Sequence, residues 1–154
     1  MNGVSKLTVT EDVALVTFNR LPADHKLIAE ILGEFAAVKM NIDMISQTTS
    51  QGGDISFSFT VAGDDMVKSL ELLKRMSASG TAVRPFVSSG NTKIQLYGEE
   101  MRDMYGVAAR AIDVVARTGA QVVIITTSEV DISLLCAGAH VDECIGELEK
   151  EFAL

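Results

Sequence analysis

Apolar and polar positions recur along the chain with two different periods. Across residues 54–61, apolar side chains such as Ile55 and Phe57 alternate with polar ones, which predicts a strand with one buried and one polar face. Across residues 25–38, apolar side chains recur three and four positions apart, which predicts an amphipathic helix. Asp24 directly precedes this segment and is a suitable N-cap. The chain therefore contains both strands and helices.

The same two periods, divided by turn signals, give an alternating order of elements. Strands are predicted over residues 4–10, 14–18, 42–49, 54–61, 81–87, 92–97, 122–127 and 130–136. Helices are predicted over residues 25–38, 65–76, 103–117 and 141–152. In the second helix we expect Met66, Leu70, Leu73 and Met76 to face inward. Residues 21–24 form a turn, Gln51-Gly52-Gly53 indicates a hairpin, and Pro85 favours an edge strand.

One segment of the chain occurs twice. Residues 41–59, NIDMISQTTSQGGDISFSF, are similar to residues 121–135, QVVIITTSEVDISLL. An offset of 80 aligns Ile42 with Val122, and an offset of 77 aligns Asp54 with Asp131, so the first copy has three extra turn residues. The offset of 80 also extends backward through the preceding helix. We interpret the chain as two copies of one unit.

The order of elements predicts an α+β fold with two ferredoxin-like units in tandem. The first unit has the order β-α-β-β-α-β, in which two helices cover one face of a four-stranded sheet. The second unit lacks its fourth strand, whereas residues 4–10 form a strand that the first unit does not need. We therefore expect this N-terminal strand to complete the second sheet. The predicted domains are residues 13–90, and residues 91–154 together with 4–10.

Composition and charge exclude several classes of function. The 154 residues are 47% apolar and carry a formal net charge of -8, which argues against nucleic acid or an anionic membrane as the main partner. No leader or membrane-spanning segment is visible, so we expect a cytoplasmic location. Cys136 and Cys144 are expected to be buried packing thiols. His25 and His140 have no second metal ligand at helical spacing, so no metal site is predicted.

The sequence contains little that could support catalysis. It has no phosphate-binding loop, dinucleotide fingerprint, nucleophile elbow or zinc-binding helix motif, so we expect no enzyme activity and no cofactor. The methionines are expected to fill the core rather than to form a ligand surface. Most acidic residues fall at helix starts or on outer helical faces, where they cap or face solvent. The remaining polar clusters lie at strand ends, residues 46–49 and 126–129, where the hydroxyls could bind a ligand or satisfy neighbouring backbone groups.

These strand ends carry a resemblance to a known family. Asn41-Ile42-Asp43-Met44-Ile45, with Gln47 and then Asp54-Ile55-Ser56-Phe57, is similar to the first ACT domain of aspartate kinases. Thr126-Thr127-Ser128-Glu129-Val130 and the loop 98–108 resemble the second ACT domain. The resemblance covers nearly the whole chain, but the kinase domain has no counterpart. It implies a regulatory fragment, a separate regulatory subunit or a stand-alone relative.

In this family, paired ACT domains bind end-product amino acids. The resemblance implies an allosteric module that binds lysine or threonine and gives feedback control of aspartate-family amino-acid biosynthesis. It also implies homodimers formed through the ACT domains, and a kinase domain or catalytic subunit as partner. A free amino acid needs N–H groups at a helix start for its carboxylate and oxygens for its ammonium. The positions that match the family's effector-binding residues are Asp24, Asn41, Ile42, Asp43, Gln47, Met101, Asp103, Gly106, Val107, Gln121, Val122, Thr127, Ser128 and Glu129.

The first of the two expected effector sites departs from the family pattern. Where the family usually has an acidic residue followed by Pro-Gly, this chain has Ala23-Asp24-His25-Lys26. A lysine in place of glycine could block the ligand, or Asp24 could replace the displaced acid. The second loop keeps Gly106 and has Tyr105 where proline is common. The alternative function is therefore a dimerisation or interaction module with a degenerate, empty site.

Overall fold

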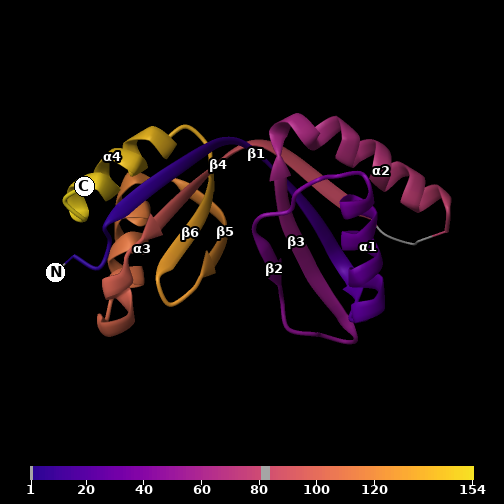
Figure 1. The fold of residues 1–154 in the computed structure, drawn as a ribbon, viewed down its shortest axis with the longest axis horizontal. Helices are drawn as coiled ribbons and strands as arrows, with labels where there is room; N and C mark the ends of the chain where they lie inside the picture. The colour runs from indigo at the N-terminus through magenta and orange to yellow at the C-terminus, as the bar shows by residue number, and fades with distance from the viewer. Residues whose placement is uncertain (1, 81–83) are drawn as a thin grey trace. The chain divides into compact units, whose positions relative to one another are not determined.

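Strands and helices alternate along the chain, and the predicted α+β class is confirmed. The structure is a computed structural model that describes residues 2–80 and 84–154, which form six strands, four α-helices and two short 3-10 helices (Figure 1). The strands are β1 (Lys6–Pro22), β2 (Ile45–Gln47), β3 (Asp54–Ala62), β4 (Pro85–Tyr97), β5 (Gln121–Thr127) and β6 (Asp131–Ala137). The helices are α1 (His25–Ala37), α2 (Met66–Ala78), α3 (Val107–Thr118) and α4 (Val141–Glu151), with 3-10 helices η1 (Gly63–Asp65) and η2 (Glu99–Asp103).

The elements form two compact units. The first unit is Asp12–Gly90, and the second consists of Met1–Glu11 with Asn91–Leu154. The hydrogen-bonded strand order is β2-β3-β1-β4-β6-β5. Because β1 and β4 both pass a unit boundary, each contributes residues to both units.

The core of the first unit lies between its strands and the helices α1 and α2. β1 pairs antiparallel with β3, with Val16 opposite Phe59 and Phe18 opposite Phe57. Phe35 of α1 meets the edge of the Phe59 ring at a centroid distance of 4.9 Å, a favourable aromatic geometry. Asp24 is the N-cap of α1, as predicted, because its Oδ1 accepts a hydrogen bond from the Lys26 N–H at 2.9 Å.

The core of the second unit lies between its strands and the helices α3 and α4. β4 pairs antiparallel with β6, and Leu96 lies opposite Ile132. β5 pairs with the other edge of β6. The N-terminal segment lies beside β4, since the Ser5 N–H donates to the Tyr97 carbonyl at 2.8 Å. Val4 is buried in this core together with α3 and α4 side chains.

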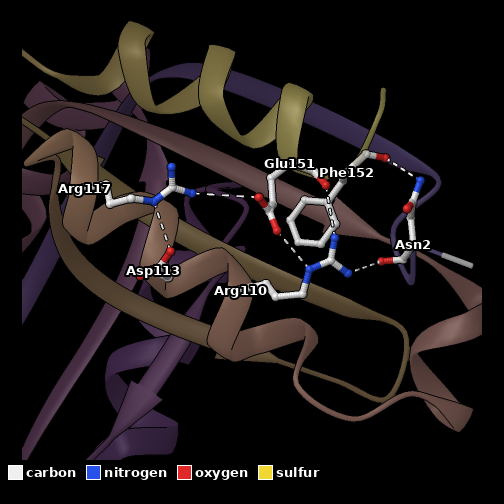
Figure 2. Close-up of polar contacts among 6 residues, drawn as sticks. All are labelled: Asn2, Arg110, Asp113, Arg117, Glu151 and Phe152. Carbon is white, nitrogen blue, oxygen red and sulfur yellow. Dashed lines mark hydrogen bonds and ion pairs between the residues drawn. The ribbon is translucent and has the colours of Figure 1, made fainter.

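Arg110 ties the two ends of the chain to α3 within the second unit (Figure 2). Its Nε and Nη2 donate to the side chain and the carbonyl of Glu151 at 3.0 and 3.1 Å. Its Nη1 donates to the Asn2 carbonyl at 3.1 Å, and the guanidinium lies over the Phe152 ring. Asn2 Nδ2 in turn donates to the Phe152 carbonyl at 2.9 Å. The N-terminal and C-terminal segments therefore share one set of polar contacts.

In two places, two strands that were predicted separately form one continuous strand. β1 contains residues 6–10 of the first predicted segment and all of 14–18. β4 contains residues 85–87 and 92–97, while residues 81–83 lie outside the described residues. Asp12, with φ 53°, lies inside β1, and Gly90, with φ 70°, lies inside β4. These left-handed conformations make the strands locally irregular but do not end them. The predicted turn at 21–24 is shorter for the same reason, because β1 continues to Pro22.

Other boundaries differ because side chains and local turns compete with the regular pattern. The strand predicted at 42–49 is regular only over β2, since the Met44 N–H donates to the Thr60 hydroxyl at 2.9 Å. The helix predicted from residue 103 begins at Val107, because η2 forms first. Leu70 of α2 is 44% exposed, contrary to prediction. The buried positions of α2 are Ser69, Leu72, Leu73 and Met76, and Met66 packs partly buried against the same core, as predicted.

The two cysteines are buried packing thiols, as predicted. Burial raises the pKa of the Cys136 thiol to about 11 and also raises the pKa of Cys144. Within residues 2–80 and 84–154, no helix has the length and apolar character needed to cross a membrane.

Candidate functional site

A cavity of about 550 Å³ lies in the second unit at the start of α3. Three elements of the unit meet around it: η2, the first turn of α3 and the loop that joins β5 to β6. The lining residues are Met101, Arg102, Met104, Gly106, Val107, Ala108, Thr127, Ser128, Glu129 and Ile132. The volume falls within the range of small-molecule sites, roughly 300 to 1,000 Å³.

Six of the residues predicted for the second effector site surround this cavity. They are Met101, Gly106, Val107, Thr127, Ser128 and Glu129. Asp103 is an exposed residue of η2 and is not among the lining residues. Gln121 and Val122 lie at the opposite end of β5 from Thr127, and Val122 packs against the core. Those three positions are therefore not brought to the cavity.

Sequence reasoning did not assign the other four lining residues to the site. Ile132 could have been found, because it follows Asp131 on the buried face of a strand next to the polar loop. Met104 and Ala108 flank Gly106 in the segment that resembles the family. Arg102 gave no signal in the sequence, since its position depends on how η2 turns.

The start of α3 is open at the cavity. Gly106 precedes the helix with φ 82° and ψ 6°, a left-handed conformation that glycine adopts without a Cβ penalty. Among the described residues, no side chain caps this helix. Backbone N–H groups of the first turn therefore retain their hydrogen-bonding capacity, and the helix dipole adds positive potential. This end of the cavity suits an anion such as a carboxylate.

The polar wall is built on a loop fixed by Ser128. The Ser128 hydroxyl donates to Asp131 Oδ1 at 2.6 Å and accepts from the N–H groups of Val130 and Asp131, both at 3.2 Å. Burial acts to raise the pKa of Asp131, but hydrogen bonds from Ser128, Gln95 and Ser133 outweigh it, so that pKa is lowered. A charged Asp131 therefore helps to hold the loop that carries Thr127 and Glu129.

Charged and apolar groups occupy different parts of the lining. Arg102 Nη1 lies 3.5 Å from Glu129 Oε2, with both side chains largely exposed. An exposed pair of this kind contributes little binding strength of its own, so Glu129 can exchange Arg102 for a ligand cation. Met101, Met104, Val107 and Ile132 supply the apolar part. The cavity thus offers an anion site, a carboxylate and an apolar surface.

The start of α1 in the first unit is arranged differently. At an offset of 80, Leu27 is the counterpart of Val107, yet α1 begins two residues earlier, at His25. This earlier start is capped by the Asp24 carboxylate, which accepts from the Lys26 N–H at 2.9 Å. In this unit a side-chain carboxylate already occupies the helix start, where α3 offers open N–H groups.

The five residues predicted for the first effector site lie apart from the two cavities found in the described part of the first unit. Asn41, Asp43 and Gln47 are exposed, whereas Ile42 packs against the hydrophobic core. None of them, nor Asp24, lines either of two cavities of about 320 and 300 Å³ in the described part of the first unit. Nor do residues 2–80 and 84–154 contain a group of three His, Cys, Asp or Glu side chains that could hold a metal ion.

Three comparisons with known proteins find similar proteins of one kind. A family model described as "ACT domain" matches residues 94–152. An aspartokinase of Pseudomonas aeruginosa is 27% identical over 151 residues, which are 98% of this chain and 37% of that protein. The chain therefore spans little more than a third of this relative.

Two solved structures have nearly the same length as this chain. The regulatory subunit of aspartate kinase from Thermus thermophilus, in its ligand-free form, has a TM-score of 0.87 at 23% identity, with 97% of this chain and 99% of that chain covered. A structure of aspartokinase alpha and beta subunits has a TM-score of 0.85 at 27% identity, with 98% and 99% covered. The likeness to these two structures therefore extends over nearly the whole length of both chains.

Proposed function

We propose that this chain, which matches an ACT-domain model over residues 94–152 and resembles aspartate kinase regulatory subunits over its length, is an allosteric module that binds a free amino acid. The observation that carries the proposal is the uncapped start of α3 in a cavity that also holds Glu129. A zwitterion can place its carboxylate on the N–H groups of the helix start and its ammonium on Glu129.

The effector we propose is lysine or threonine, with feedback control of aspartate-family biosynthesis as the result. The relatives that match are aspartokinases, which supports an end product of that route as ligand. The apolar lining accepts either the methyl group of threonine or the methylene groups of lysine. A ligand regulates only if it binds two arrangements of the protein with different affinity, so the module needs a catalytic partner whose state it shifts.

The proposal includes the organisation of the chain and its assembly. We propose two ACT domains, residues 13–90 and residues 91–154 with 4–10, that form a homodimer in the cytoplasm and act on a kinase domain or catalytic subunit. The repeat in sequence and the two compact units support this division. The effector contacts we propose in the second unit are Met101, Gly106, Val107, Thr127, Ser128 and Glu129, which share the cavity.

A second candidate function is favoured by the first unit. Its helix start is occupied by Asp24, and Lys26 stands where the second unit has Gly106. The equivalent effector site is then degenerate, and the first unit serves dimerisation or contact with the catalytic partner. This candidate excludes an effector site at the start of α1. It is compatible with a working effector site at the start of α3.

Calorimetry on the chain tests the proposed function. We expect lysine or threonine to bind, and Glu129→Gln to weaken that binding about tenfold because a charge-assisted contact to the ammonium is lost. Glu149→Gln removes an equally negative, exposed side chain from α4 and should leave binding unchanged. Equal affinities in wild type and Glu129→Gln would refute the assignment of the site.

One double variant distinguishes the second candidate. Asp24→Ala combined with Lys26→Gly uncovers the start of α1 and removes the lysine side chain. If α1 carries a degenerate site, this double variant gains a binding event that the wild type lacks. If α1 already binds the effector, the same variant loses affinity instead.

A further inference from the structure

Another cavity of the second unit, about 370 Å³ in volume, lies beside residues 2–5, which we call the N-terminal strap. Its lining residues are Asn2, Gly3, Val4, Ser5, Gly98, Glu99 and Glu100. The 3-10 helix η2 borders both cavities of this unit, because its first two residues line this one and the next two, Met101 and Arg102, line the α3 cavity. The N-terminal strap and the α3 cavity therefore share one wall.

Gly3 of the strap packs directly against side chains that line the α3 cavity. It is buried and has φ 81°, a left-handed conformation that favours glycine. A Cβ at this position would lie 2.7 Å from Val107 Cγ2 and 3.3 Å from Met104 Sδ. Both of these side chains belong to the apolar part of the α3 cavity. The backbone of Gly3 therefore supports that part of the lining.

Gly98 allows the strap to come this close. A Cβ on Gly98 would overlap the carbonyl oxygen of Gly3. The φ of Gly98 is -171°, an extended backbone that any residue can adopt, so the close approach is what requires glycine here. The Gly98 N–H also donates to the Val130 carbonyl at 2.8 Å, in the loop that carries Glu129. The strap thus meets the chain where η2 and the polar loop of the α3 cavity join.

Few contacts hold the strap in this position. The Gly3 N–H donates to Glu100 Oε2 at 3.3 Å, and the Ser5 N–H donates to a backbone carbonyl of β4 at 2.8 Å. The Asn2 carbonyl accepts from Arg110 Nη1 at 3.1 Å (Figure 2). Asn2 and Ser5 are themselves exposed. A segment with so few buried contacts opens locally at a lower free energy than the core of the unit.

We infer that the N-terminal strap positions the α3 cavity, so that docking of the strap and binding of a ligand strengthen each other. The inference rests on the proposed function, since it needs a ligand at this cavity. A docked strap holds Val107 in the first turn of α3, and it holds η2 beside it. The N–H groups of that turn then keep the geometry that receives a carboxylate. Because linkage is reciprocal, a ligand in the cavity raises the docked fraction of the strap by the same factor.

Amide-resolved NMR titration of the whole chain with lysine and with threonine tests this coupling. Gly3→Ala places a methyl group against Val107 and opens the strap, so binding at amides 106–108 should weaken about fivefold or more. Gly146→Ala makes the same change in α4, where the space is free, and should leave the affinity unchanged.

Hydrogen exchange gives a second readout on the unaltered chain. A saturating concentration of the amino acid that binds should slow exchange at the amides of Gly3 and Ser5 about fivefold. A strap that only stabilises the fold would not respond to the ligand in this way. The response therefore distinguishes coupling from a purely structural role.

A pair of variants at Glu100 keeps the test decisive if Gly3→Ala does not fold. Glu100 is exposed and does not line the α3 cavity. Glu100→Ala removes the acceptor of the Gly3 N–H and should weaken ligand binding about threefold. Glu100→Gln removes the same charge but keeps an oxygen acceptor, so it should recover most of the affinity. Equal weakening in the two variants would show that charge, and not docking of the strap, affects the cavity.

The outcomes separate this inference from the proposed function. If the wild type and the variants Gly3→Ala and Glu100→Ala bind with equal affinity, the inference is overturned and the proposed effector site stands. Exchange at Gly3 and Ser5 that a saturating ligand leaves unchanged has the same meaning. If neither amino acid shifts amides 106–108 and 127–129 of the wild type, the proposed function is refuted, and the inference is refuted with it.

Discussion

The guanidinium of Arg110 lies 4.7 Å from the centre of the Phe152 ring and at the same time binds the N-terminal segment (Figure 2). This contact joins α3, whose first turn borders the candidate effector cavity, to both ends of the chain. The position of α3 in the second unit therefore depends on residues far apart in the sequence.

Replacement of Arg110 by methionine should destabilise the second unit. Arg110→Met keeps much of the apolar stem but removes three hydrogen bonds and the contact with the Phe152 ring, a loss of about 2 kcal/mol in the free energy of unfolding. Urea unfolding measures the change. Arg117→Met, which removes exposed ion pairs on the same helix, should cost less than about 1 kcal/mol. Similar losses in the two variants would contradict the role assigned to Arg110.

Two glycine-to-alanine changes should alter stability in opposite directions. Gly106 has φ 82° and free space where a Cβ would lie, so Gly106→Ala costs only the strained backbone, about 1 to 2 kcal/mol. Gly146 lies inside α4 with ordinary φ and free space, so Gly146→Ala should stabilise by up to about 1 kcal/mol. Thermal unfolding of both variants tests the signs, and a stabilising Gly106→Ala would contradict the left-handed helix start.

The cap of α1 should be measurable in the first unit. Asp24→Ala removes the acceptor for the Lys26 N–H and should lower the free energy of unfolding by about 1 kcal/mol. Asp24→Asn retains an acceptor at the same position and should lose much less. Hydrogen exchange at the amide of Lys26 gives a local readout. Unchanged exchange in Asp24→Ala would show that the carboxylate is not the cap in solution.

The buried thiol of Cys136 predicts a loss of stability at alkaline pH. Its folded pKa of about 11 lies above the ordinary value of 9.0, so the stabilisation is complete below about pH 9 and is lost as the pH rises toward 11. Urea unfolding at several pH values should show this decline, and Cys136→Ala should show a shallower one. If the free energy of unfolding falls equally steeply with pH in the two proteins, burial does not raise the pKa of the Cys136 thiol.

Local patterns in the sequence predicted most elements, because helix faces and strand alternation depend on neighbouring residues. The repeat located β2 to β3 and β5 to β6, and the position of Asp24 alone predicted its role as a cap. The continuity of β1 and β4 could not be predicted. A polar residue such as Asp12 can either bend a strand or end it. Which of the two occurs depends on pairing with strands that are distant in the sequence.

Site residues that the local sequence marks could be predicted, whereas residues whose position is set only by the fold could not. Residues 127–129 and Gly106 are marked by polarity and by glycine, and they lie around one cavity. Gln121 and Val122 matched the family in sequence, but seven residues of extended β5 place them at the other end of the strand. Arg102 carries no signal in the sequence, because its place in the lining depends on how η2 turns.

An amide-resolved NMR titration of the whole chain with lysine and with threonine is the sharpest test of amino-acid sensing by the second unit. We expect saturable shifts at the amides of residues 106–108 and 127–129 with at least one of the two, and about tenfold weaker binding at the same amides in Glu129→Gln. A chain whose amides at these positions do not respond to either amino acid would contradict the proposal that the second unit is an amino-acid sensor.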